Sequence, residues 1–245
     1  MTKTEKEKER AEAPFQHKMS GGVDSSASKD ITAENPFPPK NQRPSFFLSF
    51  WQFYCLSIAI TISAIGLVSF KDMAFVIFSF FYTFILSKVA FPLTVSTPRT
   101  PVFKQDNKWL KSYIQVAAII GLLLPTGYIF EGILEGDEEG AKFAAPHLFL
   151  LCFQVFMEGF AFSSKFSLGV SAFVPISYNT RRIFTLVDWV RDEFGREGIV
   201  GSMWRLQAGQ WLAVVNLVLW CFNLFCFLLP VYLPLAFEQY YKPKV

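Results

Sequence analysis

Long uncharged runs alternate with short charged segments along this chain. The two longest, Phe46 to Phe70 and Leu206 to Phe237, span 25 and 32 residues without a charged side chain. A helix of about 20 apolar residues crosses the hydrocarbon core of a bilayer, and a soluble domain has little use for several such runs. The pattern therefore predicts an integral membrane protein that crosses the bilayer several times.

Charges and prolines divide the apolar positions into five predicted spans. Lys71 and Asp72 separate the first from the second, and Pro92 ends the second. Pro125 falls inside the third, where neighbouring groups can bond the carbonyl that a proline leaves free. The predicted spans are 46–68, 73–91, 110–130, 144–164 and 210–230. The expected fold class is an all-α membrane protein, with about five transmembrane helices in a bundle over residues 46–237.

Polar tails flank the predicted bundle. Residues 1–45 mix charges with Ser, Gly and Pro and lack apolar periodicity, which is typical of a disordered segment. No apolar core follows the charged start, so a secretory signal is not indicated, and the segment is too acidic for an organelle transit peptide. We expect the first membrane helix to act as an uncleaved targeting signal and residues 238–245 to form a short C-terminal tail.

Two features lie between the fourth and fifth spans. Residues 166–180 are uncharged but too short to cross comfortably, and we interpret them as the end of the fourth helix or a segment that dips into the interface. Residues 179–194 place apolar and charged side chains on different faces of a helix, with Trp189 beside the apolar face. This predicts an amphipathic helix in the cytosolic interface, with packing against the cytosolic ends of the bundle as the alternative.

The distribution of Lys and Arg predicts the orientation. With five crossings, 19 of the 23 basic residues fall on one side, in the N-terminal tail and in the segments 88–111 and 165–205, whereas the opposite loop, 131–142, is acidic. The positive-inside rule then places the N-terminus in the cytosol and the C-terminus outside or in the lumen. We expect the protein in the endomembrane system or the plasma membrane.

Composition narrows the functional classes. Charged residues make up 18% of the chain, against about 25% in soluble domains, and the net charge of +3 is too small to indicate a nucleic-acid partner. The four cysteines lie in apolar runs and match no zinc signature, so we expect neither a metal site nor a disulfide framework. The chain also lacks a phosphate loop and a serine nucleophile elbow. We therefore expect a protein that is not an enzyme and has no cofactor.

The fourth predicted span carries a polar stripe. His147, Gln154, Glu158 and Lys165 are spaced by 7, 4 and 7 residues, which puts them on one face of a helix. An ionised carboxylate at the depth of Glu158 costs several kcal/mol if it faces lipid. It must therefore face the bundle interior, water or a cation, or be protonated. The functional interpretation is a proton or solute path, and the alternative is polar contacts that join helices.

Three further residues complete the candidate intramembrane site. Lys88, near the end of the second span, is the predicted cationic partner of Glu158. Asn216 and Asn223 are seven residues apart on one face of the fifth span. Amides within lipid usually hydrogen-bond across helices, and a substrate site is the second interpretation.

One short motif predicts a protein partner. Asn35-Pro36-Phe37, in the N-terminal tail, is the tripeptide that endocytic EH domains bind. A chance occurrence is the alternative. The expected partners are thus the lipid bilayer and a cytosolic protein, and the sequence leaves the oligomeric state open.

Several short strings between about Val68 and Asp192 point to a known family. They are Phe91-Pro92 and the strings at 128–132, 135–137, 144–147, 154–159, 173–175 and 178–183. On these strings the chain resembles a plant family of multi-pass membrane proteins of unknown function. The resemblance implies a plant source and a membrane bundle, without a mechanism.

Two functions are expected from these features. The first is a non-enzymatic endomembrane protein that organises or recruits partners through its cytosolic tail and residues 179–194. The second is a small transporter or proton-coupled carrier that uses the polar stripe. A water-accessible cavity at Glu158, lined by Asn216 or Asn223, would favour the carrier, and a dry, closed bundle would favour the organising protein.

Overall fold

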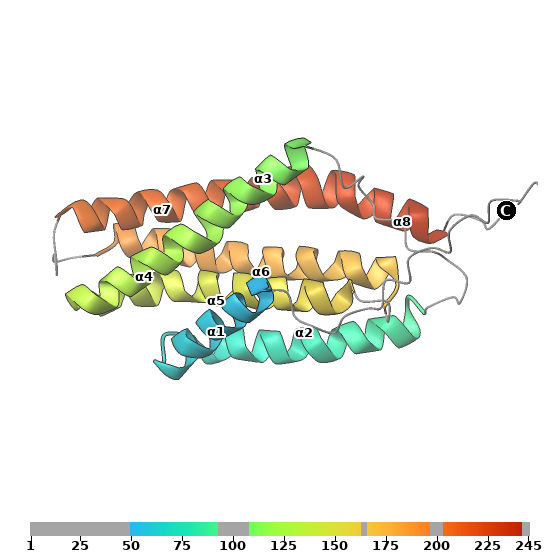
Figure 1. Cartoon of the computed structure of the whole chain (residues 1–245), viewed down its shortest axis with the longest axis horizontal. Helices are drawn as coiled ribbons and strands as arrows, with labels where there is room; N and C mark the ends of the chain where they lie inside the picture. Colours follow the sequence, from blue (N-terminus) through green and yellow to red (C-terminus); the bar gives the residue numbers. More distant parts are fainter. Residues whose placement is uncertain (1–49, 93–107, 163–165, 197–202, 242–245) are drawn as a thin grey trace, which may run out of the picture. The chain divides into compact units, whose positions relative to one another are not determined.

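The computed structural model describes residues 50–92, 108–162, 166–196 and 203–241 (Figure 1). The chain divides into Met1–Asn41 and Gln42–Val245, and all that follows concerns the second unit. The described residues contain helices and no strand, so the all-helical prediction is confirmed for them. The predicted disordered tail, the Asn35-Pro36-Phe37 motif and Lys165 lie outside the described residues.

The helices form six consecutive segments among the described residues. Two of these segments contain π-helical turns, η1 and η2, inside otherwise α-helical stretches. The elements are α1 (Phe50–Ala64), α2 (Phe70–Val89), α3 (Lys108–Ala118), η1 (Ile119–Leu123), α4 (Leu124–Glu135), α5 (Glu138–Ala161), α6 (Leu168–Phe194), α7 (Met203–Phe222), η2 (Asn223–Tyr232) and α8 (Leu233–Tyr241).

Four segments are long and apolar enough to cross a bilayer. They are Phe70–Val89, Lys108–Glu135, Glu138–Ala161 and Met203–Tyr241, and they coincide with the second to fifth predicted spans. α1 falls on the first predicted span and is apolar, but it has only 15 residues. Large exposed hydrophobic side chains cover these helices, among them Phe81, Ile114 and Val218. An apolar surface of this kind is expected where helices face lipid.

The third segment continues through Pro125 because side chains bond the carbonyls of the π-helical turn. Proline has no N–H to donate to the carbonyl four residues earlier, here that of Gly121. His147 of α5 donates from Nε2 to this carbonyl across 3.1 Å. Asn216 of α7 donates from Nδ2 to the neighbouring carbonyl of Ile120, also across 3.1 Å. The irregular turn is therefore held by interhelical hydrogen bonds.

α6 differs from the sequence-based prediction. Ser167 caps its N-terminus, where Oγ accepts a hydrogen bond from the N–H of Val170. Residues 166–180 thus start a new helix and do not end the fourth one. This helix continues unbroken through 179–194, packs on α5 and α7, and buries Arg182 completely. Polar residues of α6 contact other polar residues inside the bundle. The sequence pattern of such a helix is the same as that of a helix whose polar face contacts water.

Successive segments run in alternating directions, so most of their ends gather in two places (Figure 1). At one, called the Asp137 end, Nε of Arg205 in α7 lies 2.7 Å from Oδ2 of Asp137, which precedes α5. At the other, called the Phe91 end, the ring of Phe91 stacks on Phe237 of α8 with 5.7 Å between centroids. α6 connects the two ends, because Phe91 packs against Gly169 near its start and the Asp137 end lies at its C-terminus.

This arrangement contradicts the predicted sidedness of two segments. Residues 131–142 and 165–205 are predicted on opposite sides of the bilayer, whereas Asp137 forms ion pairs with both Arg196 and Arg205. Residues in direct contact cannot lie on opposite sides of a membrane. The predicted sidedness is wrong because α6 is a further antiparallel segment of the bundle. Its many polar residues led to the prediction of an interfacial helix instead.

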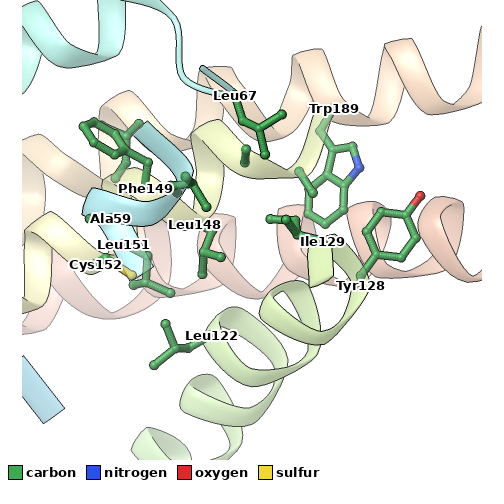
Figure 2. Packing of buried hydrophobic residues seen from close by; sticks show 14 of the residues in the cluster. Ala59, Leu67, Leu122, Tyr128, Ile129, Leu148, Phe149, Leu151, Cys152 and Trp189 are labelled. Atoms are coloured by element: carbon green, nitrogen blue, oxygen red, sulfur yellow. The ribbon is translucent and has the colours of Figure 1, made fainter. Parts of the chain in front are cut away.

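α5 lies at the centre of the hydrophobic core. Its small residues Ala141, Ala144 and Ala145 are fully buried and allow neighbouring helices to approach closely. Figure 2 shows Leu148 and Leu151 of α5 in one cluster with Ala59 of α1, Ile129 of α4 and Trp189 of α6. The central helix is therefore the one whose polar stripe is enclosed by other helices.

Candidate functional site

Gln154 and Glu158, one turn apart on α5, form the centre of a buried polar cluster. Nε2 of Gln154 donates to Oε1 of Glu158 across 2.7 Å. Oε1 of the same amide accepts from Nη1 of Arg182 in α6 across 2.6 Å. The Gln154 amide therefore connects the guanidinium of Arg182 to the carboxyl group of Glu158 through two hydrogen bonds.

Arg182 is enclosed on every side. Its Nη2 donates to Oδ1 of Asn179 across 3.0 Å, and its Cζ lies 3.7 Å from the centroid of the Trp220 ring. Nδ2 of Asn179 donates in turn to the carbonyl of Trp220 across 3.2 Å. The side chain of Arg182 has no exposed surface, so its charge is stabilised by α5, α6 and α7 together.

The structure does not bring Lys88 to Glu158. Lys88 is exposed in the last turn of α2, and none of the ion pairs found among the described residues joins it to Glu158. The cation that hydrogen bonds connect to Glu158, through Gln154, is Arg182 instead. Sequence reasoning missed it because residues 179–194 are predicted at the interface. The signal that could have revealed it is an arginine followed by apolar positions at helical spacing.

The two asparagines of the candidate site have different surroundings. Asn216 is buried and fully bonded: its Nδ2 donates to the carbonyls of Ile120 and Leu212, and its Oδ1 accepts from Nε1 of Trp220 across 3.3 Å. Asn223, at the start of η2, accepts at Oδ1 from Oη of Tyr113 across 3.0 Å. Asn216 and His147 therefore connect helices, and Asn223, which is bonded to α3, also lines a cavity.

A cavity of about 360 Å³ adjoins the Gln154–Glu158 pair. Its volume is within the usual range of about 300–1,000 Å³ for small-ligand sites. Polar groups reach it from α3, α5 and η2, and the remaining wall is mostly aliphatic and aromatic. The lining residues with polar side-chain groups include Tyr113, Gln154, Glu158, Asn223 and Tyr232. The arrangement has the composition of a small-molecule site, a mostly apolar wall with a few convergent polar groups.

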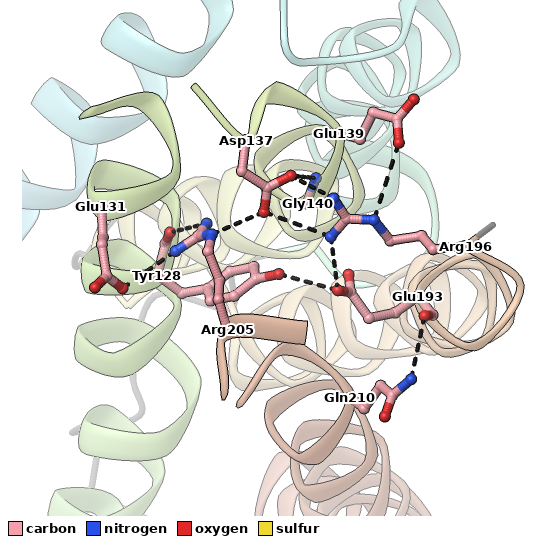
Figure 3. Close-up of polar contacts among 9 residues, drawn as sticks. All are labelled: Tyr128, Glu131, Asp137, Glu139, Gly140, Glu193, Arg196, Arg205 and Gln210. Atoms are coloured by element: carbon pink, nitrogen blue, oxygen red, sulfur yellow. Dashed lines mark hydrogen bonds and ion pairs between the residues drawn. The ribbon is translucent and has the colours of Figure 1, made fainter. Parts of the chain in front are cut away.

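A second polar cluster closes the Asp137 end (Figure 3). Arg205 donates from Nε to Asp137 across 2.7 Å, from Nη1 to Glu131 across 3.1 Å and from Nη2 to the carbonyl of Tyr128 across 2.9 Å. Arg196 pairs with Asp137 and also donates from Nη1 to Oε1 of Glu193 across 3.1 Å. The cluster ties together α4, α5, α6 and α7.

The contacts within this cluster favour the charged forms of Asp137 and Arg196. Burial alone would raise the pKa of Asp137, but the hydrogen bonds from Arg196 and Arg205 outweigh burial and lower the pKa below its ordinary value of 3.8. Burial alone would lower the pKa of Arg196, and its contacts with Asp137 and Glu193 raise it instead. Asp137 and Arg196 are therefore both ionised at neutral pH.

Glycine allows the close approach in this cluster. A Cβ on Gly132 of α4 would collide with the guanidinium of Arg205, whereas a Cβ on Gly127 in the same helix would meet no atom within 4 Å. The described residues contain no group of three or more His, Cys, Asp or Glu that could hold a metal ion. We therefore interpret this cluster as a structural contact that holds the ends of the helices together.

Comparison with known families matches most of the chain. Residues 48–241 match a family model described as a domain of unknown function, DUF7733. The chain belongs to the DUF7733 family. The match confirms the expected membership of a family without an assigned function, and it extends on both sides of the resemblance at 68–192. No curated protein and no solved structure matches the DUF7733 chain, so its function has to be argued from the site.

Proposed function

We propose that this DUF7733 protein is a small multi-pass membrane carrier whose solute binds in the cavity beside Glu158. The observation that carries the proposal is a carboxylate and two amides lining a mostly apolar cavity inside a helical bundle. Ionisable residues within membrane segments usually mark substrate or ion paths. The cavity is also the feature expected of the carrier and not of a closed organising bundle.

The organising function has less support in the described residues. One of its two expected binding surfaces, residues 179–194, is half of α6, and Arg182, Leu186 and Trp189 of this segment are buried in the bundle. Its other surface, the N-terminal tail, lies outside the described residues. The geometry therefore favours the carrier.

Water access to the cavity tests this proposal. In a variant with Cys221 and Cys226 replaced by serine, a cysteine at position 118 would line the cavity, since Ala118 does so. A charged methanethiosulfonate reagent reacts only with thiols that water reaches. We expect the Ala118→Cys thiol to be labelled in intact membranes.

The matched control is Val218→Cys. Val218 is 64% exposed on α7 and lies two residues from Trp220, which lines the cavity, so it samples lipid at a similar depth. We expect this thiol to stay unlabelled. A folded Ala118→Cys protein that is as inert as Val218→Cys would mean a dry cavity, and the carrier proposal would then be abandoned.

We also propose a revised topology in which all six antiparallel segments cross the bilayer. Both termini then lie on the same side. Sixteen of the 23 Lys and Arg residues then belong to the Phe91 side, in residues 1–49, 88–111, 165 and 242–244. The positive-inside rule favours the cytosol for that side, in the endomembrane system or the plasma membrane. In this topology the N-terminus is in the cytosol, as the sequence predicts, and the C-terminus is in the cytosol as well.

A protease-protection assay with one tag at each terminus measures this topology. We expect both tags to be digested together from the cytosolic side of sealed vesicles. A tag in the turn at Gly136, at the Asp137 end, should be protected until detergent is added. Digestion of the N-terminal tag alone would contradict the six-segment arrangement.

A further inference from the structure

The cavity beside α5 has one apolar part and one polar part. Aliphatic and aromatic side chains such as Ile114, Leu151 and Phe227 form most of its wall. The polar groups gather where α5 faces η2, with Glu158 and Gln154 on one side and Asn223 on the other. A molecule that fills this space needs an apolar body and a single polar head group.

The hydrogen bonds determine which polar head group fits. Tyr113 directs its hydroxyl hydrogen to Asn223, and Gln154 directs its amide hydrogen to Oε1 of Glu158. The carboxylate of Glu158 can accept further hydrogen bonds, because an ionised carboxylate has about four lone-pair sites. Glu158 is half-buried and lines the cavity, so it offers an acceptor to a head group that donates.

The charges of the site determine whether that head group is ionised. Arg182 is fully buried behind Gln154 and Trp220 and is not part of the cavity wall. With Glu158 ionised, its carboxylate and the guanidinium of Arg182 together carry no net charge. Either a cation or an anion in the cavity would leave one unbalanced charge in a low-dielectric interior, which is costly. An uncharged head group keeps the balance.

We propose that the cavity binds an uncharged amphiphile, an apolar chain or ring system with a hydroxyl group that donates to Glu158. This inference rests on the proposed function, because it names the class of solute that the carrier site takes. A hydrogen bond from a hydroxyl to an ionised carboxylate is stronger than one between neutral groups. The carboxylate therefore favours the alcohol over a hydrocarbon of the same length.

Three ten-carbon probes with different head groups test the ligand class. The purified full-length protein is placed in lipid nanodiscs, and its melting temperature is measured with decan-1-ol, decylamine or sodium decanoate. Decan-1-ol at about ten times its Kd is expected to raise the melting temperature by about 3–6 °C. Decylamine and decanoate should raise it by less than half as much, because each brings an unbalanced charge.

Two variants locate the effect. Glu158→Gln weakens the acceptor and should reduce the decan-1-ol shift by at least half. Ala118→Phe fills the cavity and should abolish the shift, whereas Ala208→Phe, in a different groove between α4 and α7, should retain it. Retention of the shift in Ala118→Phe would place the alcohol elsewhere and overturn the inference.

The other probes give opposite outcomes. A larger shift with decylamine would mean that Glu158 selects cations, and a larger shift with decanoate would mean that ligands reach Arg182; either result overturns the inference. These results are separable from the cysteine-labelling test. A labelled Ala118→Cys thiol without a decan-1-ol shift would leave the carrier standing and remove this class of ligand.

Discussion

Replacing Asp137 by asparagine is expected to lower the free energy of unfolding by about 3–5 kcal/mol. Asp137 is 2% exposed and forms ion pairs with both Arg196 and Arg205. The asparagine keeps the shape but leaves two buried guanidinium groups without their shared carboxylate. Loss of one partner of a buried ion pair is far more destabilising than loss of a surface pair.

Thermal unfolding in detergent, followed by loss of the monodisperse peak, measures this effect. The matched control is Glu139→Gln, two residues later, which removes an equal charge from a side chain that is 69% exposed and lies 3.9 Å from Arg196. We expect Glu139→Gln to change stability by less than about 1 kcal/mol. Equal effects of the two variants would mean that the cluster at the Asp137 end contributes nothing specific.

The pH dependence of the Asp137→Asn effect has a defined sign. The pKa of the Asp137 carboxyl group is lowered in the folded protein. Burial opposes this shift, and the hydrogen bonds from Arg196 and Arg205 produce it. A carboxylate of this kind contributes stability that is present above its unfolded-state pKa and is lost as the pH falls through the lower folded value. The difference between wild type and Asp137→Asn should therefore be constant from pH 8 to pH 5. It should shrink only below the ordinary value of 3.8.

Replacing Arg182 by methionine is expected to have a comparable cost, about 3–5 kcal/mol. The methionine fills similar space but leaves the acceptors on Gln154 and Asn179 without their donor. It also leaves the Glu158 carboxylate without a balancing charge. Arg191→Met is the control, since the side chain of Arg191 is 69% exposed.

The double variant Arg182→Met/Glu158→Met distinguishes charge balance from simple packing. If the two charges depend on each other, the double variant should be more stable than Arg182→Met alone, because no unpaired ion remains. Unfolding in the same detergent is the measurement. Additive losses in the double variant would show that Arg182 and Glu158 do not interact through Gln154.

The sequence predicts the apolar helices better than the polar interior. A run of about 20 uncharged residues indicates a helix that can span a bilayer. The predicted spans at 73–91, 110–130, 144–164 and 210–230 accordingly coincide with observed helices. The compensation expected at Pro125 also occurs, with His147 bonding the carbonyl of Gly121. These features depend on local composition and on backbone chemistry.

The role of α6 could not be predicted in the same way. Arg182 and Glu193 resemble the polar face of a surface helix until Gln154, Asn179 and Tyr128 are placed beside them. These partners lie on other helices or on the same helix one turn away, and their pairing is a property of the packed bundle. A charge pattern does not state whether water or another side chain satisfies it.

The Asp137 cluster has a consequence for the order in which the chain can mature during synthesis. Arg196 follows Asp137 by 59 residues and Arg205 follows it by 68. When the α4–α5 hairpin leaves the ribosome, Asp137 therefore has neither of its cations. The hairpin remains incomplete until α6 and the start of α7 have been translated. The Asp137 carboxylate of the nascent protein therefore has to stay in contact with water until α6 and the start of α7 have been translated.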